Sequence, residues 1–415
     1  MQPSASRRHF LKTASAGAAA LSMTAAGYAR VAGANDRLSI GVIGCGRRGR
    51  GAHMPGVHNH AETMNVEITA LADPWKPSRE AAAELVQKWY GRPARQFVSY
   101  RDILALDDVD AVMIASCDHQ HTTHLEAAAK AGKHVYCEKP LAMDLEKLKQ
   151  ACDAVKAAGV VCQIGTQVRS MPTSTACREL FKKGVLGKIS RIEQCRNSAR
   201  PYWYSRLADA SENEVDWKEF LMDRPMRPFR ADHFTGWYGV RDFSDGPIPG
   251  LASHFIDLIH YITGAKFPHS VVAQAGIFTW KDAHEFSCPD QVEATWTYPE
   301  GFMVNYTTNF GNSNGNRIHF YGRHGTLDMT PWSAPKISGA GAVEKGELGA
   351  ETPVEPIDTP DHFLDWLQCI RTGGTCRAPI DAGYQHAVAV IMAVRAADTG
   401  RRQVYDVDKR EIREG

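Results

Sequence analysis

Three glycines that directly follow an apolar run constrain the fold of this chain more than any other feature. The run Leu38 to Ile43 is followed by Gly44, Gly46 and Gly49, which gives the pattern G-x-G-x-x-G. Glycines at these positions let backbone amides and a helix N-terminus approach a pyrophosphate, because side chains there would obstruct the ligand. The context therefore predicts a dinucleotide site at the end of a strand.

An acidic residue stands where such a site needs one. A second apolar run, 66–72, ends in Asp73, which is placed to accept hydrogen bonds from an adenosine ribose. No arginine follows to receive a 2′-phosphate, since the next residues are Pro74, Trp75 and Lys76. NAD is therefore the expected cofactor, and Lys76 keeps NADP open as the alternative. The basic residues Arg47 and Arg48 belong to the glycine turn.

The N-terminus has the pattern of a twin-arginine export signal. Residues 6–12 read S-R-R-H-F-L-K, small and apolar residues follow over 13–29, and 32–34 reads A-G-A. This predicts a signal over 1–34 and a periplasmic or otherwise exported protein. The stretch is too short and too weakly apolar for a stable membrane span, and no later run reaches about 18 apolar residues. We expect no stable membrane insertion after processing.

Export by this route restricts how a nicotinamide cofactor is used. Twin-arginine cargo crosses the membrane already folded, so a nucleotide acquired in the cytoplasm would travel with the protein. No pool of free nicotinamide cofactor is assumed outside the cytoplasm. A tightly held cofactor is therefore expected, with the hydride returned within the same active site.

Composition excludes several partners. The chain has 415 residues, and its 48 basic and 47 acidic side chains leave a net charge of +1. This balance gives no electrostatic reason to bind nucleic acid or an anionic membrane. The ten cysteines include no C-x-x-C pair or zinc-like spacing, so buried free thiols are expected and no metal site is assigned.

The hydrophobic pattern changes near residue 165 and predicts two domains. Before it, strands at 38–43, 66–72, 111–116, 134–137 and 160–164 alternate with helices at 78–90, 121–131 and 145–158. This α/β alternation predicts a doubly wound parallel sheet, a Rossmann domain, over 35–165. After it, strands at 189–197, 271–279, 292–298, 302–309 and 317–321 predict an open, mostly antiparallel sheet in an α+β domain over 166–415. That domain also carries predicted helices at 173–183, 362–371 and 382–399, a surface loop at 333–360, and an insertion dense in aromatic residues at 199–243.

The stretch 131–142, A-G-K-H-V-Y-C-E-K-P-L-A, resembles the hallmark of the Gfo/Idh/MocA family of glucose–fructose oxidoreductase and inositol dehydrogenase. The resemblance covers nearly the whole chain after the predicted signal. It implies an NAD(P)-dependent oxidoreductase, with Lys139 of the E-K-P motif contacting the substrate hydroxyl. Pro140 is implied to be a cis-proline that presents the lysine, and Glu138 a positioning partner. A lysine that is partly desolvated beside a cationic nicotinamide is pushed toward its neutral form and can accept a proton.

The second implied constellation is incomplete. Relatives carry an aspartate four residues before a histidine at the start of a helix, and here Gly250 stands in the aspartate position before His254. Lys139 and His254 must then share the proton chemistry, or another group must substitute. Asp257, one turn later, is predicted either to orient His254 and contact substrate or to be a structural residue.

Further residues are assigned to the site by position. Ser116 ends the predicted strand 111–116 and His121 follows it, at the carboxyl edge of the sheet. Both are implied to lie near the nicotinamide, and Trp75 is implied to lie near the nucleotide. The histidines within 119–124 have a spacing that metal ligands can have, but no second cluster of ligands accompanies them, so no metal is assigned there. Gln167 and Arg169 resemble pocket-lining positions, although they are also placed to brace the domain junction.

The aromatic insertion predicts carbohydrate recognition. Flat rings suit the C–H faces of pyranoses, and Tyr204 and Trp237 are the assigned substrate contacts. The resulting prediction is a periplasmic oxidoreductase acting on a sugar or sugar derivative. Two alternatives stay open: an NAD-dependent glycosidase or lyase that oxidises a ring hydroxyl transiently, with His254 or Tyr204 as acid–base, and a non-catalytic sugar sensor. The resemblance also implies a homodimer or homotetramer.

Overall fold

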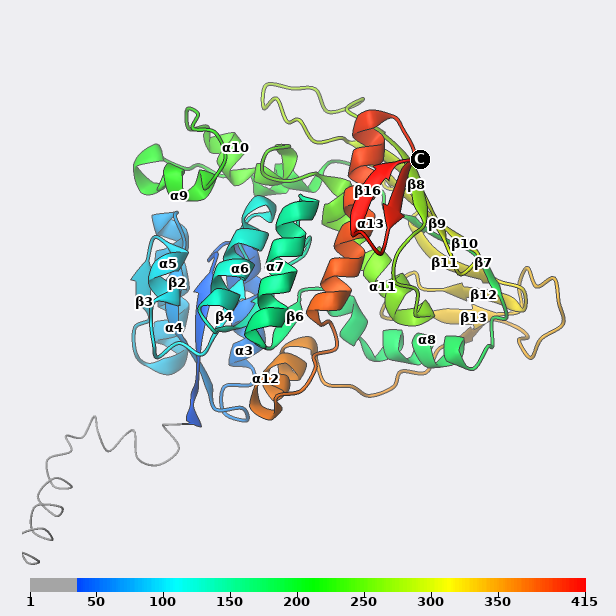
Figure 1. Ribbon diagram of the computed structural model, residues 1–415, viewed down its shortest axis with the longest axis horizontal. Coiled ribbons are helices and arrows are strands. Elements are labelled where there is room, and N and C mark those ends of the chain that lie inside the picture. Colours follow the sequence, from blue (N-terminus) through cyan, green and yellow to red (C-terminus); the bar gives the residue numbers. More distant parts are fainter. Residues whose placement is uncertain (1–35) are drawn as a thin grey trace, which may run out of the picture.

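The computed structural model describes residues 36–415, which form two domains built on two sheets (Figure 1). The predicted export signal lies outside the described residues. Among the described residues, no helix has both the length and the apolar character needed to cross a membrane.

The first domain is a six-stranded parallel sheet in the order β3-β2-β1-β4-β5-β6. Its central strands are buried apolar runs, as both-face coverage by helices requires. The predicted doubly wound sheet is confirmed. The strands are β1 (Leu38–Ile43), β2 (Val66–Ala72), β3 (Arg95–Phe97), β4 (Ala111–Ile114), β5 (His134–Cys137) and β6 (Cys162–Ile164). The helices are α3 (Met54–His58), α4 (Lys76–Tyr90), α5 (Tyr100–Leu104), α6 (His121–Lys130) and α7 (Leu145–Ala158).

The second domain is a ten-stranded sheet in the order β14-β13-β12-β11-β7-β10-β9-β8-β15-β16. β7 runs parallel to β10, and the other neighbours are antiparallel, so the predicted open, mostly antiparallel sheet is confirmed. The strands are β7 (Ile189–Cys195), β8 (Ser270–Gly276), β9 (Gln291–Tyr298), β10 (Phe302–Asn309), β11 (Arg317–Gly322), β12 (Gly325–Asp328), β13 (Lys336–Ser338), β14 (Thr352–Pro353), β15 (Gln403–Asp406) and β16 (Glu411–Glu414).

The prediction of a surface loop over 333–360 was wrong in part. β13 and β14 extend the sheet at this edge. Both strands are short and mostly exposed, so they leave no alternating pattern in the sequence. β3 and β16, which are also short and have no buried residue, were missed as well. β12 and β15 were missed too, although alternate residues in each are buried.

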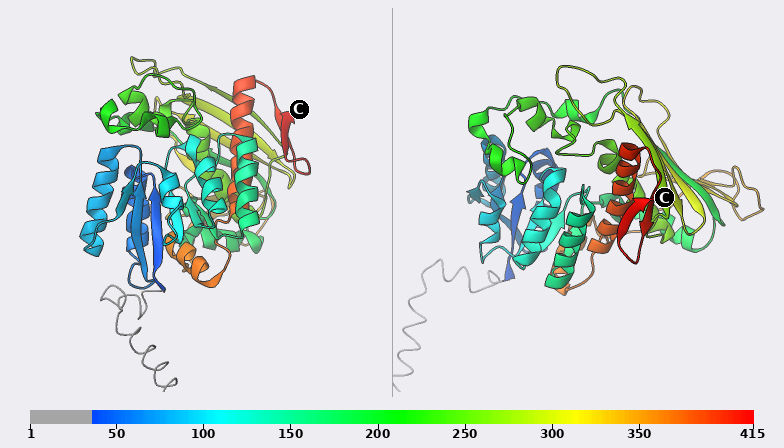
Figure 2. Two further views of the ribbon diagram at one scale, coloured as in Figure 1. Left: turned by 60° about the vertical axis from the view of Figure 1, so that its left-hand side comes forward. Right: turned by 45° about the horizontal axis from the view of Figure 1, so that its top comes forward.

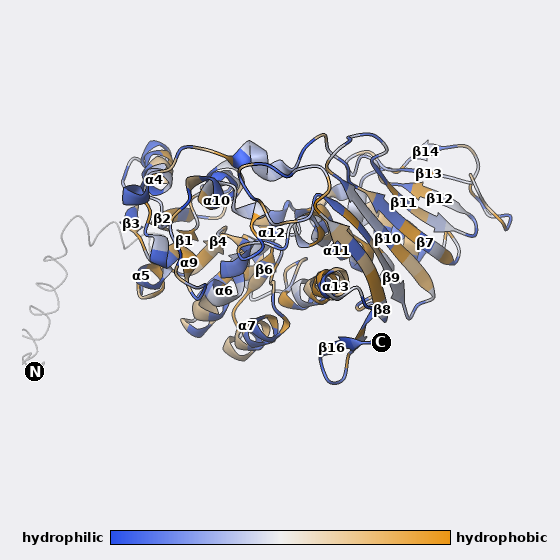
Figure 3. Ribbon diagram, turned by 90° about the horizontal axis from the view of Figure 1, so that it is seen from above, coloured by the Kyte–Doolittle hydropathy of each residue, from blue (hydrophilic) through white to orange (hydrophobic). Residues whose placement is uncertain are grey.

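Helices cover one face of the second sheet and leave the other open (Figures 2 and 3). The covering helices are α8 (Pro172–Lys182), α11 (Ser253–Thr263) and α13 (Ile380–Thr399). In β10 the residues Phe302, Val304 and Tyr306 are buried, while Met303 between them is exposed. Trp296 of β9 donates its indole N–H to the carbonyl oxygen of Ala389 in α13, 2.9 Å away, and so anchors the helix to the sheet.

The aromatic insertion folds over the carboxyl edge of the first sheet, with α9 (Trp217–Leu221) and α10 (Ala231–Thr235) above β2 and β3 (Figure 1). Most of its rings pack on one another and form a separate small core. The amide of Asp216 donates to the carbonyl oxygen of Pro74, and Val215 pairs with Trp75 in an isolated β-bridge. The insertion is therefore bonded to the loop that follows β2.

One helix from the C-terminal part of the chain returns to the first domain. α12 (His362–Thr372) buries Trp366 and Leu367 in the core formed by β1, β2 and α3. The ring of Phe363 packs so closely on Gly56 that an added Cβ there would lie 2.3 Å from it. The core of the first domain is thus completed by residues far beyond its own segment.

Candidate active site

A cleft of about 650 Å³ lies at the carboxyl edge of the parallel sheet. Its walls come from the glycine turn, the ends of β2, β4 and β5, the aromatic insertion and the start of α11. Open α/β sheets bind ligands at this edge. The lining residues that the sequence assigned to the site are Gly44, Gly46, Arg47, Arg48, Asp73, Trp75, Ser116, His121, Glu138, Lys139, Trp237 and His254.

The three glycines of the turn have three different surroundings. Gly44 adopts a φ of +94°, and an added Cβ would lie 2.6 Å from the backbone of Ser116. A Cβ on Gly49 would lie 2.3 Å from the carbonyl oxygen of Gly44. A Cβ on Gly46, by contrast, would meet nothing within 4 Å. Two glycines therefore close the turn tightly, while the third leaves space toward the cleft where a pyrophosphate fits.

Asp73 is buried at the end of β2 and holds the turn in place. Its carboxylate accepts a hydrogen bond from the amide of Cys45 at 2.6 Å and another from the amide of Trp75 at 2.8 Å. Burial raises its pKa to about 6, although these two bonds act against the shift. Each oxygen keeps a second lone pair, so Asp73 can still accept from the ribose hydroxyls of NAD.

The aromatic insertion covers the nucleotide end of the cleft. The ring of Trp75 meets that of Phe234 edge-on, with centroids 5.5 Å apart. Arg47 of the glycine turn donates to the carbonyl oxygen of Ser205 at 2.9 Å. These contacts join both sides of the cleft, so a dinucleotide held there would be enclosed by the insertion.

Lys139 and His254 line the same cleft from different domains. Lys139 follows β5, its bond to Pro140 is cis as the resemblance implied, and its ammonium donates to the carbonyl oxygen of Gly250 at 2.7 Å. Burial lowers the pKa of Lys139, with Glu138 and Asp118 opposing. Burial, followed by the charge of Lys139, lowers the pKa of His254 to about 3. The Lys139 amine and a neutral His254 imidazole therefore line one cleft.

Glu138 connects the glycine turn to the motif lysine. Its Oε1 accepts from Arg48 at 2.6 Å and from Gln167 at 3.0 Å, and it lies 2.9 Å from Nε2 of His53. Burial alone would raise the pKa of Glu138, but the His53 hydrogen bond and the Arg48 charge outweigh it and hold the pKa well below its usual value. Glu138 is thus a fixed anion, which suits the predicted positioning role. Gln167 supports Glu138 and does not line the cleft.

His121 lies in the wall of the cleft. Its Nδ1 is 2.7 Å from the carbonyl oxygen of Pro140, and its Nε2 is 3.1 Å from that of Ser116. The ring therefore ties the end of β4 to the loop that carries Lys139. His119 instead donates to the carbonyl oxygen of Phe220 at 2.9 Å and fastens the aromatic insertion.

Asp118 is a site residue that the sequence did not single out. It is buried in the cleft wall, accepts from the hydroxyl of Ser244 at 2.7 Å, and interacts electrostatically with Lys139. Burial raises its pKa to about 7. Its position directly after the fourth strand is the sequence signal that could have identified it as a site residue. The neighbouring histidines were considered there instead.

Besides Gln167, three further residues predicted to contact substrate lie outside the cleft. Arg169 forms a buried two-bond ion pair with Asp257, at 2.9 Å from Nε and 2.7 Å from Nη2, which braces the domain junction. Tyr204 donates to Asp282 at 2.6 Å within the aromatic core. The substrate assignments of Arg169, Asp257 and Tyr204 are therefore corrected to structural ones, and Tyr204 is not placed to act as an acid–base.

Gly250 is surrounded closely by the aromatic insertion. A Cβ added there would lie 2.4 Å from the hydroxyl oxygen of Tyr202. That hydroxyl is buried and finds no hydrogen-bond partner among the described residues. Tyr202 therefore fills the space into which a side chain at position 250 would project.

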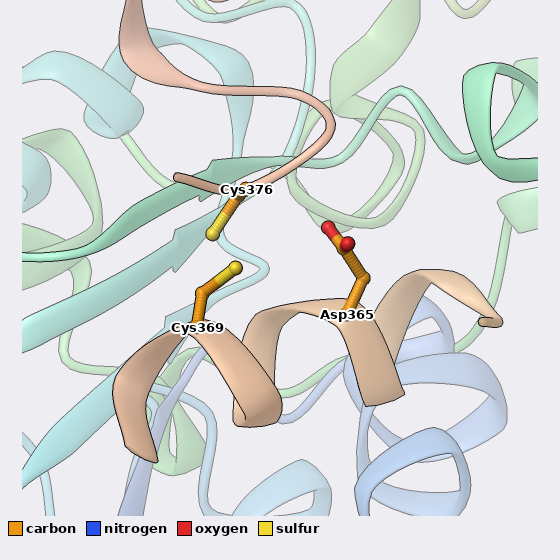
Figure 4. A group of neighbouring side chains, drawn as sticks. All are labelled: Asp365, Cys369 and Cys376. Atoms are coloured by element: carbon orange, nitrogen blue, oxygen red, sulfur yellow. The ribbon is translucent and has the colours of Figure 1, made fainter. Parts of the chain in front are cut away.

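One cluster with metal-ligand chemistry lies outside the cleft (Figure 4). Asp365, Cys369 and Cys376 place their ligand atoms within 4.8 Å of one another in α12 and the loop after it. Oδ2 of Asp365 accepts from the side chain of Gln163 and from the amide of Arg377, so this carboxylate already holds the loop. Burial raises the pKa of both thiols.

Curated proteins with related sequences include levoglucosan and inositol dehydrogenases. Levoglucosan dehydrogenase of Pseudarthrobacter phenanthrenivorans is 32% identical over 236 residues, which are 55% of this chain and 52% of that protein. Inositol 2-dehydrogenase of Rhizobium meliloti is 30% identical over 192 residues, 45% of this chain and 55% of that protein. The chain spans about half the length of the curated relatives it matches.

Solved structures share the fold over most of the chain. Aldose–aldose oxidoreductase of Caulobacter crescentus superimposes with a TM-score of 0.67 at 22% identity, covering 88% of this chain and 99% of that one. Levoglucosan dehydrogenase in complex with NADH gives 0.68 at 18% identity, covering 88% and 98%.

Two family profiles match nearly all of the described chain. Residues 38–166 match the NAD-binding Rossmann fold of an oxidoreductase family, and residues 178–406 match the C-terminal alpha/beta domain of the same family. The chain therefore belongs to the Gfo/Idh/MocA family of oxidoreductases.

Proposed function

We propose that the protein is an NAD-dependent dehydrogenase of a sugar or sugar derivative. The observation that carries this proposal is the cleft itself, in which a glycine cradle and Asp73 lie at one end and Lys139 and His254 at the other. The levoglucosan and inositol dehydrogenases among the relatives support a polyhydroxylated substrate. NAD, when bound at the glycines, supplies the hydride acceptor.

The side chains around the reacting hydroxyl divide the proton chemistry. Lys139, whose pKa burial lowers, accepts the hydroxyl proton in its neutral form. His254 stays neutral, and its Nδ1 has no partner among the described residues, so the imidazole is available to orient the hydroxyl by a hydrogen bond. Asp118 lies in electrostatic reach of Lys139 and takes part in setting when the amine loses its proton.

The finer proposal is that the protein is exported with its cofactor in place and recycles it internally. Two observations support it. The arginine pair at positions 7 and 8 fits a twin-arginine signal. The aromatic insertion encloses the nucleotide end of the cleft through Trp75, Phe234 and the bond between Arg47 and Ser205, which slows release of a bound dinucleotide.

A dimer or tetramer formed through the second sheet belongs to the same proposal. Helices cover one face of this sheet, and the other face is free for a second copy (Figure 2). Its exposed side chains include Met303 and Val272.

The decisive experiment starts with protein purified without added nucleotide. Absorbance and mass spectrometry should find NAD, and an empty protein with weak affinity would contradict retention. Incubation with sugars and an acceptor sugar should then give a keto sugar or lactone. Net hydrolysis of a glycoside in deuterated water, with deuterium beside the oxidised carbon, would instead indicate a glycosidase. Binding without turnover of any sugar would indicate a sensor.

A further inference from the structure

Arg206 is the one arginine of the aromatic insertion that lines the cleft. It ends the short helical turn Tyr202–Arg206 and is half-buried. Its guanidinium lies over the ring of Tyr238, 5.9 Å from the centroid. Tyr238, Trp237 and Lys139 line the same space. Arg206 is therefore part of the wall around the proposed reacting centre.

The donors of Arg206 have no acceptor in the part of the chain that the structure describes. No carboxylate lies within ion-pair distance, and the buried Nε makes no hydrogen bond. The two arginines of the glycine turn differ, because Arg47 donates to Ser205 and Arg48 to Glu138. A guanidinium that is half out of water with unmet donors is costly unless a ligand supplies the acceptors.

A planar guanidinium fork binds carboxylates and phosphates through two parallel hydrogen bonds. Two such anions are available to this cleft, the pyrophosphate of the cofactor and an acidic group on the substrate. The pyrophosphate belongs at Gly46, where the turn leaves space. The guanidinium of Arg206 lies over the ring of Tyr238 in the wall that also carries Lys139, and its charge acts on Lys139, so we place it at the reacting end.

Nearby carboxylates do not compete for this guanidinium. Glu138 is bound to Arg48 and His53, and Asp118 accepts from Ser244. Glu138 and Asp118 act electrostatically on Lys139, whereas the positive charge of Arg206 has no ion-pair partner among the described residues. A neutral sugar would leave that charge unmet, while an acidic sugar would neutralise it.

We propose that Arg206 binds a carboxylate of the substrate, so that the preferred substrates are sugar acids or their glycosides. This inference rests on the proposed dehydrogenase function and names its substrate class. It assigns Arg206 to substrate recognition and leaves proton transfer with Lys139.

The test compares sugar acids with their neutral methyl esters, using D-glucuronate and D-galacturonate as probes. The wild-type holoenzyme should show a kcat/KM at least about tenfold higher for an acid than for its ester. Arg206→Gln should bring that ratio close to one by raising KM for the acid. Arg206→Lys should keep part of the preference. Arg200→Gln is the matched control, because Arg200 belongs to the same segment but stacks on Tyr204 and Trp280 outside the cleft.

Three results would overturn the inference. The first is a wild type that turns over acids and esters with equal kcat/KM. The second is an Arg206→Gln variant that loses activity equally toward both. The third is an Arg206→Gln variant that loses NAD but keeps the acid preference, which would assign the arginine to the pyrophosphate. If no sugar is turned over, the dehydrogenase proposal fails separately. Calorimetric binding of each acid and ester to the NAD-loaded protein then decides the role of Arg206, and equal binding of acid and ester would reject it.

Discussion

The ammonium of Lys139 donates to the carbonyl oxygen of Gly250 at 2.7 Å, and this single bond joins the end of β5 to the turn that begins α11. The amine is therefore positioned against His254 by a backbone group of the second domain. Because the acceptor is a carbonyl oxygen, the contact does not depend on a side chain at position 250. The two domains must keep their present arrangement for the amine and the imidazole to face the same space.

Replacing the lysine tests the proposed proton acceptor. Lys139→Met should lower kcat by about 10²–10⁴-fold, because the hydroxyl proton loses its positioned acceptor. The NAD content of the purified protein should stay unchanged, since the glycine turn and Asp73 are intact. Activity within about threefold of the wild type would show that another group takes the proton.

A side chain at position 250 should be harmful because of Tyr202. Gly250→Ala should destabilise the protein by about 1–3 kcal/mol, since its Cβ would lie 2.4 Å from the tyrosine hydroxyl. Tyr202→Phe removes that oxygen and leaves the nearest ring carbon 3.5 Å away. The double variant should therefore recover stability in urea unfolding. Equal destabilisation in both backgrounds would mean that the close contact is not the cause.

Gly46 should matter for the cofactor and not for folding. Gly46→Ala adds a methyl group that meets no protein atom within 4 Å but projects where the pyrophosphate is expected. Its affinity for NAD, measured by titration after nucleotide removal, should fall at least about tenfold with an unchanged melting temperature. Gly349→Ala, also with open surroundings, is the control and should bind NAD normally.

The charge of Asp118 should influence the pH profile of the enzyme. If neutral Lys139 accepts the proton, kcat/KM rises with pH through the pKa of Lys139. Asp118 raises that pKa by its negative charge, so Asp118→Asn should move the rising limb to lower pH. Glu219→Gln, which removes a carboxylate beside the end of β3, should leave it in place. A limb that moves to higher pH would contradict this role of Asp118.

The buried pair of Arg169 and Asp257 should contribute stability at neutral pH. Burial alone would raise the pKa of Asp257, but Arg169 and His386 hold it far below its usual value. A carboxyl group whose pKa is depressed in the folded state contributes its full stabilisation above its unfolded pKa of about 3.9. That stabilisation is lost as the pH falls toward the folded pKa. Asp257→Asn should therefore cost about 3–5 kcal/mol at pH 7 by leaving Arg169 buried without its anion.

Urea unfolding at pH 7 measures the stability that Asp257→Asn loses. The double variant Arg169→Met, Asp257→Leu should recover most of it, because no charge is then left buried. A single variant as stable as the wild type would show that the pair is not needed.

The sequence predicted most of the first domain because its signals are local. β1, β2 and β5 begin and end where the apolar runs do, and the glycine turn with Asp73 lies where the motif placed it. In the second domain the alternating strands β9 and β10 were found for the same reason. Short edge strands such as β14, with two exposed residues, carry no periodicity to detect.

The site residues also divide into those that a local sequence signal reveals and those whose position depends on packing. Lys139 and His254 were found through a motif, whereas the place of Tyr204 depends on which aromatic rings pack together. The partners Arg169 and Asp257 lie 88 positions apart, and no local pattern links them. Asp118 stands out only when the cleft shows which neighbours it has.

Because α12 supplies Trp366 to the core beneath β1, the dinucleotide-binding half is not an independent folding unit. A fragment ending near residue 166 would expose the apolar surface that this indole covers. During synthesis, the core of the N-terminal half therefore cannot close until the chain from residue 167 through α12 (His362–Thr372) has been made. A ribosome-bound intermediate should accordingly gain nucleotide affinity late, only after α12 has left the exit tunnel.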